Sequence, residues 1–138
     1  LSIGVWNGSY HFQEEGKLKE LAAAGINLVI GINPVWHSSE DSWTYILDKA
    51  YEYGISFIVD PRDYVNGGYA EWDGTLPDYG KHPAVVGFIA YDEPINVGSN
   101  GTENIFNILD AAQAKFNEER IRLNREDLIF FVNIFYKI

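Results

Sequence analysis

Hydrophobic and polar positions divide this 138-residue chain into two kinds of segment. Short apolar runs bounded by glycine, proline or aspartate predict buried β-strands, whereas longer runs with apolar residues three and four apart predict helices. The predicted strands cover residues 2–6, 26–32, 55–59, 84–91 and 128–135, and the predicted helices cover 13–24, 41–53 and 102–119. Gly25 and Gly54 follow the first two helices and mark their C-terminal ends.

The regular alternation of strand and helix predicts an α/β fold with a parallel sheet and right-handed crossovers. Residues 64–81 break the pattern and predict a long loop, either a binding loop or a poorly ordered one. Two architectures remain open. A doubly wound, five-stranded domain would account for the whole chain, whereas a (β/α)8 TIM barrel needs about 250 residues, so that this chain would supply only its first five strands.

The strand over residues 84–91 directs an acidic group to its own C-terminal end. Pro83 precedes it, and Asp92, Glu93 and Pro94 follow it. Because side chains alternate along a strand, Glu93 is expected on the face that carries Gly87. The second strand also has two unlike faces, since Leu28, Ile30 and Ile32 are large and the residues between them are small or polar.

Each predicted strand ends in groups that can form hydrogen bonds or stack against a ligand. Because the C-terminal ends of parallel strands meet at one edge of the sheet, we expect these side chains to line one pocket. The candidate binding residues are Trp6, Asn33, Trp36, His37, Asp60, Arg62, Tyr91, Asp92 and Asn133, with Glu93 as the candidate catalytic residue. Taken singly, each has a structural alternative, such as a loop cap, a core lid or an exposed ion pair.

Composition narrows the choice of ligand. The formal net charge of −10 disfavours nucleic acid and anionic membrane surfaces, whereas a neutral sugar would not be repelled. The aromatic share of 15% suits stacking against sugar rings. Cysteine is absent, which excludes disulfides and thiolate metal sites, and no apolar run approaches the roughly 20 residues of a membrane helix.

The sequence also contains no methionine. This absence is typical of a processed or excised piece, and we expect that a signal peptide or flanking domain was removed from it. We therefore expect a secreted, periplasmic or cell-surface protein.

The chain resembles the first half of a clan A (β/α)8-barrel glycoside hydrolase. The resemblance lies in five stretches: Gly4–Trp6, Ala24–Val29, Tyr79–Pro83, Tyr91–Pro94 and Phe131–Phe135.

That resemblance implies a retaining hydrolase that acts on a carbohydrate and needs no cofactor or metal. It implies that Glu93 is the general acid/base and that Asp92 stands where the family has an asparagine that holds the sugar 2-hydroxyl. It also implies that the nucleophile, a second glutamate at the end of the seventh strand, lies outside this chain. Residues 1–138 would then be one α/β domain whose open sheet edges are covered by the rest of the barrel or by a second copy.

Other functions remain compatible with the sequence. A glycan-binding module could keep the aromatic and polar strand ends without catalysis. A sugar isomerase or hydrolase that uses a divalent metal could employ His37, Asp60, Asp63 and Glu93, although their spacing matches no metal motif. A doubly wound nucleotide or flavin protein is less favoured, because Asn7-Gly8-Ser9 is too short for a phosphate-binding loop.

Overall fold

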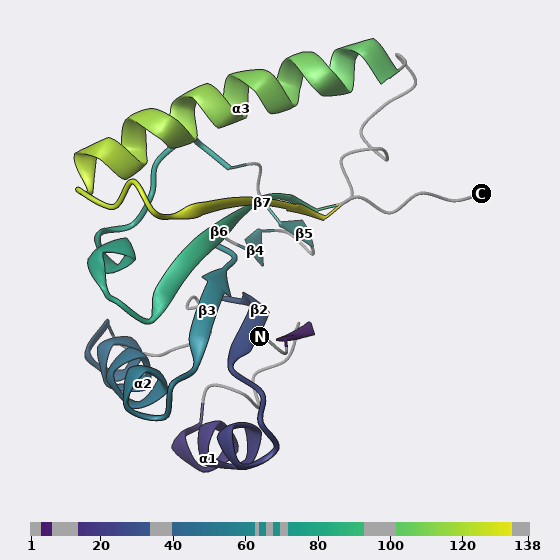
Figure 1. Ribbon diagram of the computed structural model, residues 1–138. Coiled ribbons are helices and arrows are strands. Elements are labelled where there is room, and N and C mark those ends of the chain that lie inside the picture. Colours follow the sequence, from purple (N-terminus) through teal and green to yellow (C-terminus); the bar gives the residue numbers. More distant parts are fainter. Residues whose placement is uncertain are drawn as a thin grey trace.

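The dominant feature of the protein is a curved parallel sheet with helices on its outer side (Figure 1). The computed structural model describes residues 4–6, 14–33, 40–62, 64–65, 68–69, 72–92 and 102–133. The sheet contains β1 (Gly4–Trp6), β2 (Leu28–Ile32), β3 (Ser56–Val59), β6 (Val85–Asp92) and β7 (Ile129–Asn133). All pairs of neighbouring strands are parallel, so the predicted α/β class with a parallel sheet is confirmed.

The strands lie in the sheet in the same order as in the chain, β1-β2-β3-β6-β7. With right-handed crossovers, such an order places every connection on one face of the sheet. Figure 1 shows this arrangement, with α1, α2 and α3 all on the outer side of the curve. A doubly wound sheet reverses its strand order partway, and the five described strands contain no such reversal. The fold is compatible with a series of βα repeats.

The three described α-helices begin and end close to their predicted bounds: α1 covers Glu15–Ala23, α2 covers Glu40–Glu52 and α3 covers Thr102–Arg122. Gly25 and Gly54 follow α1 and α2 with φ of +77° and +71°, a conformation that glycine adopts without strain. Tyr51, an apolar position of α2, is exposed. Its ring lies edge-on to that of His82, with centroids 6.4 Å apart.

Part of the segment expected to be a loop is packed into the fold. The strands β4 (Tyr64–Val65) and β5 (Gly68–Tyr69) form a separate antiparallel pair, and η3 (Asp78–Lys81) is a short 3-10 helix before β6. Leu76 and Gly80 are buried, and the Tyr79 ring contacts both Trp43 of α2 and Phe88 of β6. Residues 72–81 therefore cover the sheet between α2 and α3, where a regular βα repeat would place a helix.

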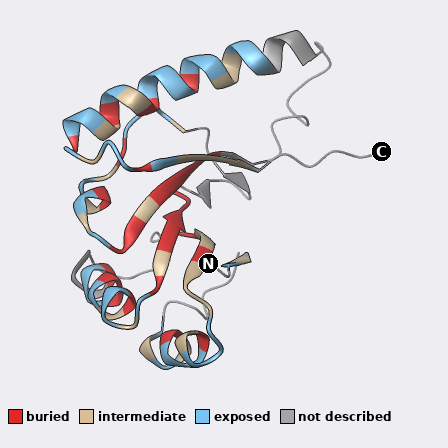
Figure 2. Ribbon diagram, in the orientation of Figure 1, coloured by how far each residue is buried: buried red, intermediate tan, exposed pale blue. Residues whose placement is uncertain are grey.

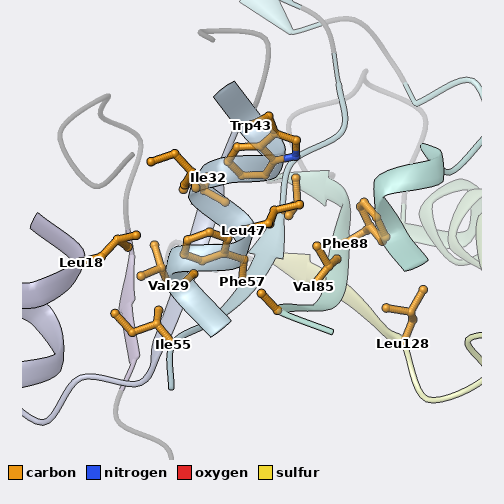
Figure 3. Close-up of a cluster of buried hydrophobic side chains, with 14 of the residues drawn as sticks. Leu18, Val29, Ile32, Trp43, Leu47, Ile55, Phe57, Val85, Phe88 and Leu128 are labelled. Atoms are coloured by element: carbon orange, nitrogen blue, oxygen red, sulfur yellow. The ribbon is translucent and has the colours of Figure 1, made fainter. Parts of the chain in front are cut away.

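One hydrophobic core lies between the sheet and this outer layer. Figure 2 shows that burial concentrates in β3, in β6 and on the inner sides of the helices. Paired residues on neighbouring strands face the same side, and they form two rows, Val29–Phe57–Val85 and Ile32–Val59–Phe88. Leu18, Trp43, Leu47 and Leu128 pack around these rows (Figure 3).

The pleat of β2 is interrupted at Gly31. The pairing of β2 with β3 shifts between Ile30 and Ile32, and Gly31 between them has φ of +85°. As a result Val29 and Ile32, three residues apart, both join the core on the helix-covered face. The expectation that Leu28, Ile30 and Ile32 share one face is therefore wrong beyond Gly31.

Strand β6 carries two similar irregularities. Its pairing with β3 shifts after Val85, so that Val85 and Phe88, again three residues apart, both face the core. Its pairing with β7 shifts between Ile89 and Tyr91. Because each shift interrupts the alternation of side chains, counting along β6 does not fix the face on which Glu93 lies. Glu93 is outside the described residues.

Candidate functional site

The C-terminal ends of the five parallel strands form one edge of the sheet, which we call the strand-end site. Hydrogen bonds and strand register show how these ends are brought together. The amide of Asp60 donates to the carbonyl oxygen of Ile32 at 2.8 Å, which joins the end of β3 to the end of β2. Asp92 and Asn133 are register partners at the ends of β6 and β7.

Asp60 and Arg62 form a bidentate ion pair in this site. Arg62 Nε donates to Asp60 Oδ1 at 2.8 Å, and Nη2 donates to Oδ2 at 2.7 Å. The Arg62 amide also donates to Asp60 Oδ1, at 3.1 Å. The side chains are only 10% and 6% exposed, so the alternative of an exposed surface pair is wrong. Both carboxylate oxygens of Asp60 accept from Arg62, which makes Asp60 a poor candidate for a nucleophile or a base.

Asn33 completes the described part of the strand-end site. It is 3% exposed, and its Nδ2 donates to the carbonyl oxygen of Arg62 at 2.8 Å. Asn33 follows β2, whereas Asp60 and Arg62 follow β3, so these contacts tie two adjacent loops together. Buried polar groups require partners of this kind, since an unpaired one costs roughly 1–3 kcal/mol. Sequence reasoning placed all three residues at this edge, and their role in binding stays a prediction.

The remaining candidates are placed in part or not at all. The backbones of Trp6, Tyr91, Asp92 and Asn133 lie at the ends of β1, β6 and β7, but their side-chain positions are outside the described structure. Trp36, His37 and Glu93 lie outside the described residues altogether. The described part of the site therefore consists of Asn33, Asp60 and Arg62, which hydrogen bonds join to one another. These residues lie next to β6, the strand that leads into Glu93.

Sequence reasoning overlooked a second buried polar cluster, on the helix side of the sheet. Glu119 of α3 is 9% exposed, and its Oε2 accepts from the Leu76 amide at 2.9 Å and from Arg122 Nε at 3.0 Å. Arg122 Nη2 in turn donates to the carbonyl oxygen of Leu76 at 2.6 Å. The hydrogen bond from Arg122 holds the pKa of Glu119 below its ordinary value, with help from the Leu76 amide and against the effect of burial.

A signal for this cluster was present in the sequence. Glu119 lies three residues after Phe116 and seven after Ala112, which places it on the inward stripe of α3 together with these two core residues. An acid on such a stripe, with an arginine three residues later, predicts a buried carboxylate that is paired with a more exposed arginine. The cluster fastens residues 72–81 to α3 and lies on the helix side, away from the strand ends.

Within the described ranges, no group of three or more histidine, cysteine, aspartate or glutamate residues is arranged to hold a metal ion. Of the residues proposed for a metal enzyme, only Asp60 falls within these ranges, and Arg62 occupies both of its oxygens. In the part of the chain that the structure describes, no helix is both long and apolar enough to cross a membrane.

Comparison with known proteins adds no relative. No family model, no curated protein and no solved structure matches the chain. Inference about function therefore depends on the geometry of the strand-end site and on the residues that follow its strands.

Proposed function

We propose that the chain is the first part of a (β/α)8 barrel and that the protein is a glycoside hydrolase of the retaining type. Glu93 is the general acid/base, and the strand-end site holds the sugar. A secreted, periplasmic or cell-surface location belongs to the same proposal. The observation that carries it is the meeting of polar strand ends, Asn33, Asp60, Asp92 and Asn133, at one edge of a parallel sheet whose strands follow the order of the chain.

Two features support a barrel. Five parallel strands in chain order, with the three described α-helices on the outer face, are what consecutive βα units of a barrel provide. In such barrels the loops after the strands carry the chemistry, whereas the opposite edge serves stability. Asn33, Asp60 and Arg62 follow β2 and β3 directly, so they would lie on that side of a barrel.

The proposed reaction divides the work between two carboxyl groups. Glu93, protonated, donates its proton to the leaving glycosidic oxygen, while a second, ionised carboxylate attacks the anomeric carbon. Glu93 then removes a proton from the water that hydrolyses the glycosyl-enzyme intermediate. The attacking carboxylate lies outside the five described strands, roughly 5 Å from Glu93 in the closed barrel.

Substitution of Glu93 tests this role. We expect Glu93→Gln to lower the rate of glycoside hydrolysis about 100-fold or more while leaving sugar affinity nearly unchanged, because glutamine keeps the size of the side chain but cannot transfer a proton. Hydrolysis and binding should be measured on a panel of neutral oligosaccharides, both with this chain and with the longer protein that the proposal implies. Glu126→Gln, in the exposed turn before β7, is the control and should leave both quantities unchanged.

Three results would contradict the proposal. Sugar binding without hydrolysis by either form would indicate a glycan-binding module. Hydrolysis or isomerisation that EDTA abolishes and a divalent metal restores would indicate the metal enzyme. Full activity of Glu93→Gln would remove Glu93 from the reaction.

A further inference from the structure

We propose that the strand-end site is selective for uncharged glycans, because Asp60 holds Arg62 in an internal ion pair and thereby withholds it from an acidic sugar. The inference rests on the proposed function and adds a substrate class to it. It also gives Asp60 a role that can be measured, namely that of a residue that determines charge selectivity.

The first step concerns the geometry of Arg62. A guanidinium group recognises a carboxylate by donating two parallel hydrogen bonds, which is the usual way in which a protein binds an acidic ligand. Arg62 already makes this contact, with Nε and Nη2 donating to the two oxygens of Asp60 at 2.8 and 2.7 Å. The backbone of Arg62 is also fixed, since its amide donates to Asp60 Oδ1 and its carbonyl oxygen accepts from Asn33 Nδ2. The preferred carboxylate-binding side of Arg62 therefore faces Asp60.

The second step concerns the charge around Arg62. From the last residue of each sheet strand to the third residue after it, the sequence contains three acids, Asp60, Asp92 and Glu93, and one cation, Arg62. The other cations in the described part of the chain lie in α1, α2, η3 and α3 or in the turn before β7. With Asp60 paired to Arg62 and Glu93 protonated as the proposed reaction requires, Asp92 supplies the remaining charge of this set, so a sugar carboxylate would meet a negative charge and a guanidinium that is already neutralised. A neutral sugar meets only hydrogen-bonding groups.

The protein also contains a matched ion pair at the other edge of the sheet. Arg125 and Asp127 are likewise two residues apart, with Arg125 Nε and Nη2 donating to the two oxygens of Asp127 at 2.9 and 2.8 Å. Arg125 donates as well to the carbonyl oxygens of Gly80, His82 and Val85, at the start of β6. This pair has the same donor and acceptor atoms at the opposite location, and Asp127 is 66% exposed where Asp60 is buried, so Asp127→Asn is a control for the loss of one carboxylate charge from the molecule.

The test compares two sets of probes on the full chain by calorimetric titration. One set contains neutral oligomers of glucose, mannose, galactose and xylose, and the other contains oligomers of glucuronic, mannuronic and galacturonic acid. The unaltered chain should bind a neutral oligomer and should bind the uronates at least tenfold more weakly. Because the repulsion is electrostatic, this ratio should shrink as salt is raised from 0.05 to 0.5 M.

Asp60→Asn should bring the two affinities together. Asparagine keeps the size of the side chain and one acceptor oxygen but removes the negative charge that Arg62 faces in Asp60, so uronate affinity should rise roughly tenfold or more while neutral affinity changes little. Asp127→Asn should leave both affinities as they are. Circular dichroism establishes that each variant is folded, and if Asp60→Asn does not fold, the salt dependence of the unaltered chain decides.

The outcomes separate this inference from the proposed function. Uronate binding by the unaltered chain that equals or exceeds neutral binding overturns the selectivity, whether or not hydrolysis occurs. A folded Asp60→Asn variant without any gain in uronate affinity overturns the role of Asp60. Neutral binding without hydrolysis leaves the selectivity standing and overturns only the enzymatic function, whereas binding of neither set overturns both.

Discussion

Glu119 shows how one buried carboxylate can stabilise the fold through partners from a distant part of the chain. It joins α3 to the Leu76 backbone, 43 residues earlier in the sequence. Arg122 lowers the pKa of Glu119, which means that the folded protein binds this proton less tightly than the unfolded chain does. Ionised Glu119 therefore stabilises the fold above its ordinary pKa, and this stabilisation is lost as the pH falls through the lowered folded-state value.

Replacement of Glu119 should change both the stability and its dependence on pH. We expect Glu119→Gln to lower the free energy of unfolding at pH 7 by about 1–3 kcal/mol, because Arg122 and the Leu76 amide lose a charged acceptor. The difference in stability between pH 7 and pH 3 should also become smaller, since the titrating group is gone. Urea unfolding at a series of pH values measures both effects.

The neighbouring Glu118 provides the control for this experiment. It is exposed and pairs with Lys115 at 3.1 Å on the surface of α3, so Glu118→Gln should change stability by less than about 0.5 kcal/mol. Equal losses from both substitutions would show that the Glu119 cluster does not stabilise the fold.

At the scale of elements, local pattern was enough to predict the helices and strands but not the irregularities between them. The apolar stripes of α2 and α3 and the glycines after α1 and α2 are local features. The structure confirms the glycines and the burial of most of the described stripe residues, with Tyr51 as the exposed exception. The shifts at Gly31 and within β6 depend on pairing with other strands, which a single strand does not encode. Residues 72–81 lack any period because contacts with distant elements, above all Glu119, hold them in place.

The same distinction applies to the strand-end site. The positions of Asn33, Asp60 and Arg62 at one edge follow from the parallel sheet, which the sequence predicts, and from the order of its strands, which the sequence left open between two architectures. The bidentate geometry of Asp60 and Arg62 does not follow from the sequence, because an aspartate two residues before an arginine is also common in exposed loops. Only the burial of both side chains distinguishes the two cases.

Gly87 tests how closely β6 and β7 must approach one another. A Cβ atom added at Gly87 would lie 2.6 Å from the carbonyl oxygen of Ile129, its register partner in β7, so the two strands would have to separate. We expect Gly87→Ala to lower the free energy of unfolding by about 1–3 kcal/mol. Gly16 has nothing within 4 Å of the same position and lies in α1, so Gly16→Ala should leave stability unchanged or raise it. Guanidinium unfolding of both variants measures the contrast, and a neutral effect at Gly87 would contradict the close approach.

At the scale of the whole molecule, the sheet is open. Among the described strands, β1 pairs only with β2 and β7 only with β6, so each outer strand has one unpaired side. Ile129 of β7 is 50% exposed, and its register partner, Gly87, has no side chain to cover it. Adjacent Phe130 faces the core, where its ring lies 5.2 Å from that of Phe116, so Ile129 faces the side of the sheet that the helices leave uncovered. An unpaired edge with an exposed apolar residue invites pairing with another chain.

We therefore expect the isolated 138-residue chain to self-associate, with an associated fraction that rises with concentration. Sedimentation velocity over a hundredfold range of concentration measures this fraction. Ile129→Lys should shift the equilibrium toward monomer, because a charge on an edge strand opposes strand addition. Ile121 provides the control, since it is 64% exposed but lies on the outer layer in α3, so Ile121→Lys adds the same charge without reaching the sheet. If Ile121→Lys dissociates the chain as well as Ile129→Lys does, then net charge rather than the open edge governs association. A monodisperse monomer at every concentration would mean that the open sheet needs no further strands, which would also remove one support for a larger barrel.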